Sequence, residues 1–183
     1  MQILPEHLIT DDFISTKKIQ CNLKIVDESY ETHRDLINLI KYPGSHSIDN
    51  LSHSIGCNVP SDSLPDTFES ARELYGNDSG SLARHYIIGF KYAPNLVNPS
   101  TLPFIAYNIA MFFSPCYQVV YAFHESPVTP GMFHIHLVVS NTNIMNGNRL
   151  PRNEEFKRKF CNYINSIRMG NHSLNVSYAT NYF

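Results

Sequence analysis

The order of apolar and polar residues along the chain predicts an alternation of short strands and amphipathic helices. Strands are expected where apolar and polar residues alternate, or where Val, Ile and Tyr gather between turn residues. Helices are expected where apolar residues recur every three or four positions behind a Ser or Asn that can cap the helix. The expected strands are 18–26, 84–90, 117–124, 132–140 and 173–179. The expected helices are 30–41, 64–75, 100–113 and 153–169.

The connections between these elements favour the α+β class. A turn from Pro127 to Gly131 joins two of the strands as a hairpin. We therefore expect a central, largely antiparallel sheet with helices packed on one face. Ser29 is the expected N-cap of the first helix, and Pro43-Gly44 its end. No repeat or long linker divides the sequence, so residues 1–183 are expected to form a single domain, with 1–16 as an irregular arm.

The composition is typical of a folded globular domain, with 43% hydrophobic and 16% charged residues. No apolar run reaches the roughly 18 residues that a membrane span needs, and the N-terminus lacks the basic start of a secretory signal. We therefore expect a cytoplasmic protein without membrane contact. The four cysteines form no C-x-x-C pair, so a zinc ribbon has no support and four reduced thiols are expected.

The charge distribution bears on nucleic-acid binding. The net charge of −2 is low for a nucleic-acid binder, because phosphate neutralisation supplies much of the affinity of such proteins. Residues 149–168, however, carry a local charge of +4, which leaves −6 on residues 1–148. The candidates for phosphate contacts are Arg149, Arg152, Lys157 and Arg158. The alternative interpretation of this run is a solvated helix face.

Three histidines form a candidate metal site. His134 and His136 lie two residues apart in an expected strand, so their imidazoles share one face and Ile135 points to the other. His124 ends the preceding strand, and the hairpin can bring all three imidazoles together. Three neutral imidazoles with open coordination positions suit a catalytic divalent metal, and imidazole alone prefers Zn²⁺, Mn²⁺, Co²⁺ or Ni²⁺. The alternative is a set of half-buried strand histidines without a ligand.

The segment 124–150 resembles the third motif of plasmid mobilisation relaxases of the MobA/MobL-like type. In these proteins a strand that ends in His is followed by a short loop, His-x-His, an apolar run, an Asn-rich stretch and a small-Gly-basic turn. The corresponding residues here are His124, His134, His136, Asn141, Asn143 and the turn Asn146-Gly147-Asn148-Arg149. A weaker resemblance covers about 17–180, including the strand with His85, the stretch Ser54-Ile-Gly-Cys57-Asn58 and the helix with Tyr42. The chain departs from the pattern at Ser126, where an acidic residue is usual.

The resemblance implies the fold of the His-hydrophobic-His single-tyrosine endonucleases and their activity, a metal-dependent nicking of DNA in plasmid mobilisation, conjugation or rolling-circle-type processing. Tyr42 would attack a phosphodiester and form a 5′-phosphotyrosine link, with Tyr30 as the alternative nucleophile. His124, His134 and His136 would hold Mn²⁺ or Mg²⁺, with Zn²⁺, Co²⁺ or Ni²⁺ as alternatives. The implied partners are single-stranded DNA at a nick site and accessory relaxosome proteins.

Other polar residues are assigned supporting roles. A free tyrosine has a pKa near 10, so the nucleophile needs a base or a metal field, and His85 or Glu125 is expected to act as base or to orient a ligand. Asn141 and Asn143 are expected to brace the turn or a ligand histidine. Two alternatives remain open: a DNA-binding module on the same scaffold that is catalytically weak or inactive, and a metal-dependent nuclease in which metal-bound water attacks.

Overall fold

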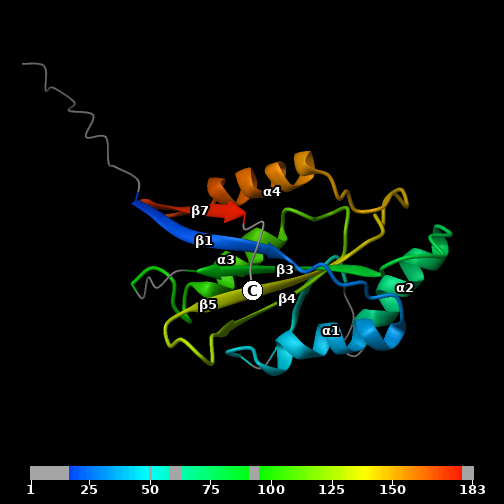
Figure 1. Ribbon diagram of the computed structural model, residues 1–183, viewed down its shortest axis with the longest axis horizontal. Helices are drawn as coiled ribbons and strands as arrows, with labels where there is room; N and C mark the ends of the chain where they lie inside the picture. Colours follow the sequence, from blue (N-terminus) through cyan, green and yellow to red (C-terminus); the bar gives the residue numbers. More distant parts are fainter. Residues whose placement is uncertain (1–16, 50, 58–62, 91–94, 179–183) are drawn as a thin grey trace, which may run out of the picture.

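The computed structural model describes residues 17–49, 51–57, 63–90 and 95–178 (Figure 1). The four expected helices and five expected strands are present, and two short strands add to them. The helices are α1 (His33–Ser45), α2 (Leu64–Leu74), α3 (Leu102–Ala110) and α4 (Glu154–Ser166). The strands are β1 (Lys17–Ile25), β2 (His53–Ile55), β3 (Ala83–Phe90), β4 (Val119–Glu125), β5 (Phe133–Ser140), β6 (Arg168–Met169) and β7 (His172–Tyr178). The expected arm 1–16 and Asn58 lie outside the described residues.

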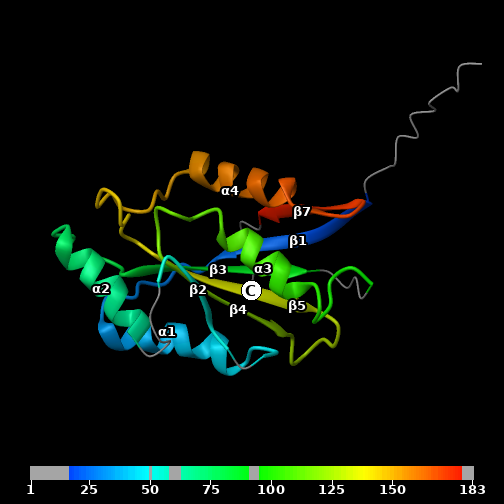
Figure 2. The same cartoon turned by 180° about the vertical axis from the view of Figure 1, so that it is seen from behind.

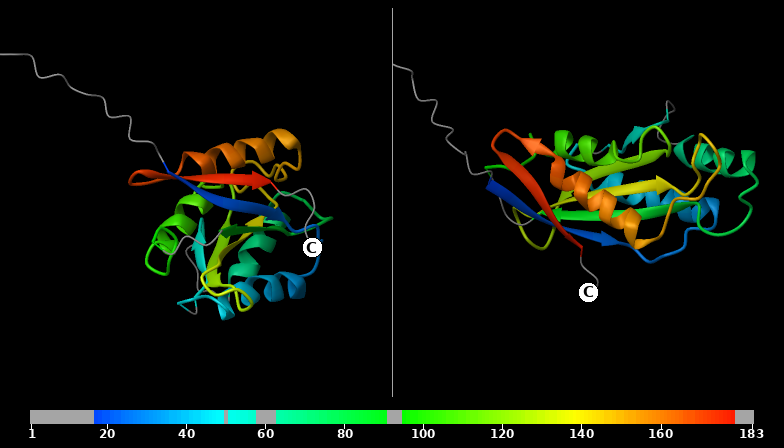
Figure 3. Two further views of the ribbon diagram at one scale, coloured as in Figure 1. Left: turned by 60° about the vertical axis from the view of Figure 1, so that its left-hand side comes forward. Right: turned by 90° about the horizontal axis from the view of Figure 1, so that it is seen from above.

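The strands form one curled sheet in the order β2-β4-β5-β3-β1-β7-β6 (Figure 3). All neighbours are antiparallel except β1 and β7, which pair in parallel from Lys17 and His172 onwards. The β4–β5 hairpin stands beside β3, so the elements with the histidines occupy adjacent positions. The expectation of an α+β fold around a largely antiparallel sheet is confirmed.

Helices cover both faces of the sheet, and the expectation of a single covered face is wrong. One face packs against α3 and α4 through an aromatic core in which Tyr86 contacts Phe113 and Phe160. The other face packs against α1 and α2, where Leu36 and Phe68 are buried in a second, smaller core (Figures 1 and 2). The physical reason is visible in β3, whose residues are buried almost without alternation. Such a strand requires cover on both faces.

The cover on the α1 side is incomplete. The smaller core joins α1 and α2 to one end of the hairpin, at Val120 and Val138. Along β1 the side chains on this face, such as Asn22 and Lys24, are exposed. This face therefore has an open part beside the covered part, and the histidines lie at the border between the two.

Three helix boundaries differ from the expectation for identifiable reasons. Thr32 rather than Ser29 caps α1, because the Thr32 hydroxyl and the Asp35 carboxylate each accept the other residue's backbone N–H. Pro43 lies inside the last turn of α1 rather than ending it. The last expected helix ends at Ser166, because the chain turns there into β6. In the part of the chain that the structure describes, no helix has both the length and the apolar character needed to cross a membrane.

Candidate functional site

The histidines share the face of the sheet that is turned toward α1. His124 and His134 are register partners across the hairpin, and His136 stands opposite Ile87 on β3. Their neighbours Phe123 and Ile135 belong to the core under α3 and α4. Because strand side chains alternate between faces, the imidazoles lie on the opposite side. The expectation that His134 and His136 share a face is confirmed.

Three imidazoles form a stacked row across the sheet. Nε2 of His124 lies 2.7 Å from Nε2 of His136, and Nδ1 of His136 lies 2.8 Å from Nε2 of His85. The ring centroids are 4.7 Å apart between His124 and His136, and 5.1 Å apart between His85 and His136. Both nitrogens of His136 therefore have a histidine partner, which fixes the orientation of this ring.

His134 stands beside the row rather than in it. Its ring centroid lies 5.5 Å from that of His124, and its buried Nδ1 has no hydrogen-bond partner among the described residues. The ring nitrogens of His124, His134 and His136 do not all lie within 4.8 Å of one another. Among the described residues, the ligand atoms of His33, Asp66 and Glu69 do lie within this distance of one another. The structure thus brings two of the expected ligands together, adds His85 to them, and leaves the third adjacent.

The protonation state of His85, His134 and His136 suits metal binding. Burial lowers the pKa of His136 to about 2, helped by its histidine neighbours, and burial lowers the pKa of His85 to about 4. Burial followed by His124 also lowers the pKa of His134. Neutral imidazoles offer the lone pairs that metal binding requires. Because the buried Nδ1 of His134 also lacks a partner among the described residues, the chemistry of His124, His134 and His136 suits a divalent metal, although their nitrogens do not converge on one point.

Tyr42 of α1 lies next to this row. Its side chain is 56% exposed, and its ring meets His136 edge-on with centroids 6.3 Å apart. His46 packs against the same tyrosine at 4.8 Å, and its Nδ1 donates a hydrogen bond to the Tyr42 carbonyl. Sequence reasoning did not indicate His46, because Pro43-Gly44 was expected to end the helix, whereas α1 continues to Ser45 and places His46 one helical turn after Tyr42.

Tyr30 occupies a different environment. It is 8% exposed, and its hydroxyl donates a 3.0 Å hydrogen bond to the Glu28 carboxylate. Burial, then this hydrogen bond and the charge of Glu28, raise the pKa of Tyr30. All three effects oppose the formation of a tyrosinate, so Tyr30 is less suited than the exposed Tyr42 to act as a nucleophile.

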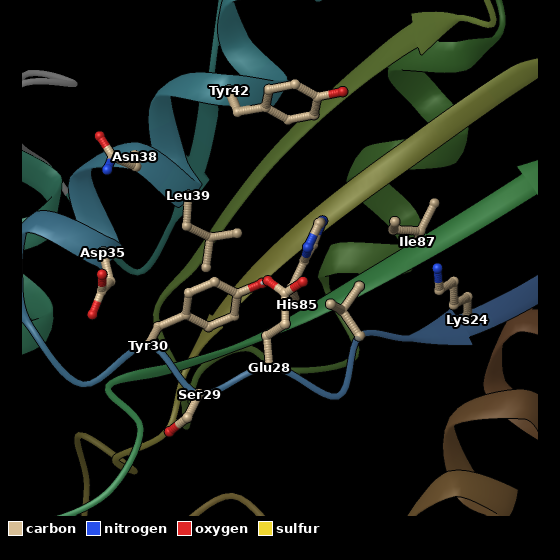
Figure 4. A pocket seen from close by; sticks show the side chains of 11 residues that line it. Lys24, Glu28, Ser29, Tyr30, Asp35, Asn38, Leu39, Tyr42, His85 and Ile87 are labelled. Atoms are coloured by element: carbon tan, nitrogen blue, oxygen red, sulfur yellow. The ribbon is translucent and has the colours of Figure 1, made fainter. Parts of the chain in front are cut away.

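A cavity of about 590 Å³ opens between α1, β3 and the end of β1 (Figure 4). Tyr42 and His85 form part of its wall, and the polar side chains of Lys24, Glu28 and Asn38 also line it. Sequence reasoning did not identify these last three residues. Asn38 alone had a local signal, because it precedes Tyr42 by one helical turn and shares its helix face.

The Glu125 carboxylate is engaged in the loop between β4 and β5. Its Oε1 accepts the backbone N–H of Gly131, and the carbonyl of Glu125 lies 3.1 Å from Nδ1 of His124. These contacts close the hairpin loop and hold the His124 ring. His85, in contrast, touches His136 directly. Both residues expected to serve as base or to orient a ligand thus contact an expected ligand histidine, Glu125 through its backbone carbonyl and His85 through its side chain.

Both asparagines hold backbone, but only Asn143 does so within its own turn, where both had been expected to act. The Asn141 side chain donates a 2.9 Å hydrogen bond to the Ser81 carbonyl, which ties the end of β5 to the segment before β3. The Asn143 side chain accepts the N–H of Met145 within the following turn. Neither contact reaches a histidine.

Arg149 and Arg152 line a second cavity, of about 460 Å³, which adjoins the first because Ser29 lines both. Arg149 is held by a 2.6 Å hydrogen bond to the Ser79 carbonyl. Two of the four expected phosphate contacts therefore lie in a cavity that adjoins the one beside Tyr42.

Lys157 and Arg158 lie elsewhere. Both belong to α4, which covers the opposite face of the sheet through Phe160 and Ile164. Lys157 forms a 2.6 Å ion pair with Glu154 on the same helix. Lys157 and Arg158 therefore line neither cavity, because α4 packs on the face of the sheet opposite α1, and their contact with DNA stays a prediction.

His33 connects α1 to α2. Its Nδ1 lies 2.7 Å from Glu69, and its Nε2 lies 3.7 Å from Asp66. The two ring nitrogens thus face different carboxylates, which is the geometry of a bridge between two helices. This bridge helps to fix α1, and with it Tyr42, against the rest of the fold.

Comparison with known proteins adds one finding. A family model described as Relaxase: MobA/VirD2-like, nuclease domain, matches residues 45–170. The matched segment contains His85, His124, His134 and His136, whereas Tyr42 lies three residues before its start. No curated protein and no solved structure matches the chain.

Proposed function

Because the chain belongs to the MobA/VirD2-like relaxase nuclease family, we propose that it nicks single-stranded DNA by transesterification, with Tyr42 as the nucleophile. The observation that carries this proposal is the position of Tyr42, exposed and edge-on to His136 at 6.3 Å between ring centroids. The family is one of metal-dependent, DNA-nicking nucleases, and the arrangement around Tyr42 supplies the residues that such chemistry needs.

The proposed reaction exchanges one phosphoester bond for another. The Tyr42 oxygen attacks the phosphorus of the scissile phosphodiester and forms a 5′-phosphotyrosine bond. The bond from phosphorus to the 3′ oxygen breaks, and this oxygen takes up a proton and leaves as a 3′-hydroxyl. The proton of the Tyr42 hydroxyl passes to solvent or to a neighbouring base. Because a phosphodiester is anionic, positioning and charge stabilisation carry most of the catalysis.

In this proposal His124, His134 and His136 hold the metal. They would bind a divalent ion, Mn²⁺ or Mg²⁺ by preference, and such an ion would supply Lewis-acid polarisation of the scissile phosphate. His85 accepts or donates a hydrogen bond at Nδ1 of His136 and fixes the orientation of that ring, as partners of ligand histidines commonly do. His46 packs against Tyr42 and limits the rotation of its ring.

Arg149 and Arg152 hold the strand by its phosphates in this proposal, since they line the cavity that continues from the one beside Tyr42. The biological setting that we propose is plasmid mobilisation, with accessory relaxosome proteins as partners. Asn141 and Asn143 support the site indirectly through the backbone contacts described above.

The decisive experiment looks for a covalent protein–DNA adduct. The protein is incubated with a labelled single-stranded oligonucleotide library and Mn²⁺, then denatured and separated by electrophoresis. We expect an adduct with the wild-type protein and with Tyr30→Phe, and none with Tyr42→Phe or in the presence of EDTA. Tyr30→Phe is the matched control, because it removes the same hydroxyl group from a tyrosine in the same cavity.

The other outcomes identify the alternatives. Cleavage that persists without an adduct in both tyrosine variants identifies a nuclease in which metal-bound water attacks. Salt-sensitive binding of the oligonucleotides without cleavage identifies a DNA-binding module that has lost catalysis. An adduct that forms with Tyr42→Phe but not with Tyr30→Phe identifies Tyr30 as the nucleophile.

A further inference from the structure

We propose that the cavity beside Tyr42 receives an unpaired base of the bound strand and favours a base with an exocyclic amine. This inference rests on the proposed function, since it assumes that the scissile phosphate lies at Tyr42. It goes beyond that function by assigning sequence preference to one cavity and one carboxylate, Glu28.

The first support is location. Tyr42 and His85 belong to the wall of the cavity, so a phosphate next to Tyr42 leaves the adjoining nucleotide at its entrance (Figure 4). The volume of about 590 Å³ lies within the range of small-molecule sites. Leu39 and Ile87 add apolar surface to the lining, which suits the faces of a base.

The second support is charge. Glu28 and Asp35 bring two carboxylates to the lining, and Lys24 brings one ammonium group. Carboxylates repel a phosphate, so the sugar-phosphate backbone is expected to remain at the edge, near Lys24 and Tyr42. The strand then turns its base, rather than its phosphate, toward Glu28. Asp35 contributes only charge, because its carboxylate is already used in the cap of α1.

The third support is hydrogen-bond chemistry. The Tyr30 hydroxyl donates to Oε2 of Glu28 and fixes the carboxylate over His85 (Figure 4). An ionised carboxylate is an acceptor with room for several donors, so Glu28 can accept further N–H groups from a ligand. Cytosine, adenine and guanine each present an exocyclic amine. Uracil and thymine present carbonyl oxygens at the corresponding position, which the carboxylate disfavours.

The test compares two fluorescein-labelled oligonucleotides that contain only deoxycytidine or only deoxyuridine. In such strands every binding register places the same base in the cavity, so the recognition sequence need not be known. Affinity is measured by fluorescence anisotropy in EDTA, which prevents cleavage. We expect the wild-type protein to bind the deoxycytidine strand at least about five-fold more tightly, the lower range for one base-edge contact.

Two variants assign the preference to Glu28. Glu28→Gln keeps the shape and an acceptor for Tyr30, and it should reduce the ratio of the two affinities to about one. Glu73→Gln removes the same charge from an exposed residue of α2 that lines neither this cavity nor the one with Arg149 and Arg152. This control should change both affinities alike and preserve the ratio.

The outcomes separate this inference from the function on which it rests. Equal affinities of the wild-type protein for the two strands overturn the base preference and leave DNA binding intact. The absence of binding to either strand contradicts the proposed DNA substrate and the inference together. A preference that persists in Glu28→Gln overturns the assignment to Glu28, and the wild-type comparison decides the base preference even where that variant does not fold.

Discussion

Burial of uncharged imidazoles makes the histidine row a source of pH-dependent stability. His85 and His136 are 6% and 5% exposed, and their neutral forms carry the mutual contacts of the row. An unfolded histidine has a pKa near 6.5, whereas burial lowers these pKa values to about 4 and about 2 in the folded protein. Between these values the unfolded chain binds more protons than the folded one, so acid favours unfolding.

We therefore expect the metal-free protein to lose stability as the pH falls from 6.5 toward 4, and to show no contribution from these groups above 7. Each histidine adds at most about 1.4 kcal/mol per pH unit to the slope of the unfolding free energy. Urea unfolding in EDTA at a series of pH values measures the slope. His136→Gln should flatten it, and an unchanged slope in this variant would show that the row does not titrate on unfolding.

At the scale of elements, the loop after β5 depends on its neighbours as much as on its own turn. Gly147 has a φ of 75°, and a Cβ there would lie 2.6 Å from the ring of Tyr75. The Tyr75 hydroxyl donates to the Ile144 carbonyl, and the Asn77 amide donates to the Gly147 carbonyl. The end of α2 thus fixes the loop that carries Arg149.

We expect Gly147→Ala to lower the free energy of unfolding more than Gly76→Ala does. Gly76 has a similar φ of 62°, but a Cβ at this position would meet nothing within 4 Å, so Gly76→Ala should cost about 1–2 kcal/mol from backbone strain alone. The clash with Tyr75 should add about 1–3 kcal/mol for Gly147→Ala. Equal losses in the two variants, measured by urea unfolding, would show that Tyr75 moves aside without cost.

The elements also show what local pattern can and cannot predict. Alternation along 132–140 is sufficient to place His134 and His136 on one face, because the period of a strand is fixed by its backbone. The expected start of α1 is wrong although Thr32 and Asp35 form a recognisable capping box. The lining of the cavity by Lys24 and Glu28 could not be predicted, because it depends on how closely α1 approaches the end of β1.

At the scale of the whole molecule, the placement of positive charge matters more than the net charge of −2. The cations on the proposed DNA path are Lys24, Arg149 and Arg152, whereas those of α4 lie behind the sheet. Few phosphates are then neutralised, and binding should depend only moderately on salt.

On a single strand, each phosphate contact contributes about −0.7 to the slope of the logarithm of the binding constant against the logarithm of salt concentration. Three contacts therefore give an expected slope of about −2. Arg152→Gln should make the slope shallower by about 0.7. Arg158→Gln removes an exposed arginine from the far face and should leave the slope unchanged. Anisotropy titrations at several salt concentrations measure these slopes. If only Arg158→Gln makes the slope shallower, the DNA lies along α4 rather than beside Arg152.

The parallel pairing of β1 with β7 determines when the domain is completed during synthesis. β1 enters the ribosome exit tunnel first among the described strands, and β7 enters last, yet the two are neighbours in the sheet. Until β7 emerges, one long edge of β1 presents unpaired backbone groups, and such edges invite association with other chains. Pairing between distant segments is also slow to form. Until β7 emerges, the nascent chain therefore carries an open edge along β1, and the strand that leads to Lys24 at the cavity beside Tyr42 gains its second neighbour only with β7.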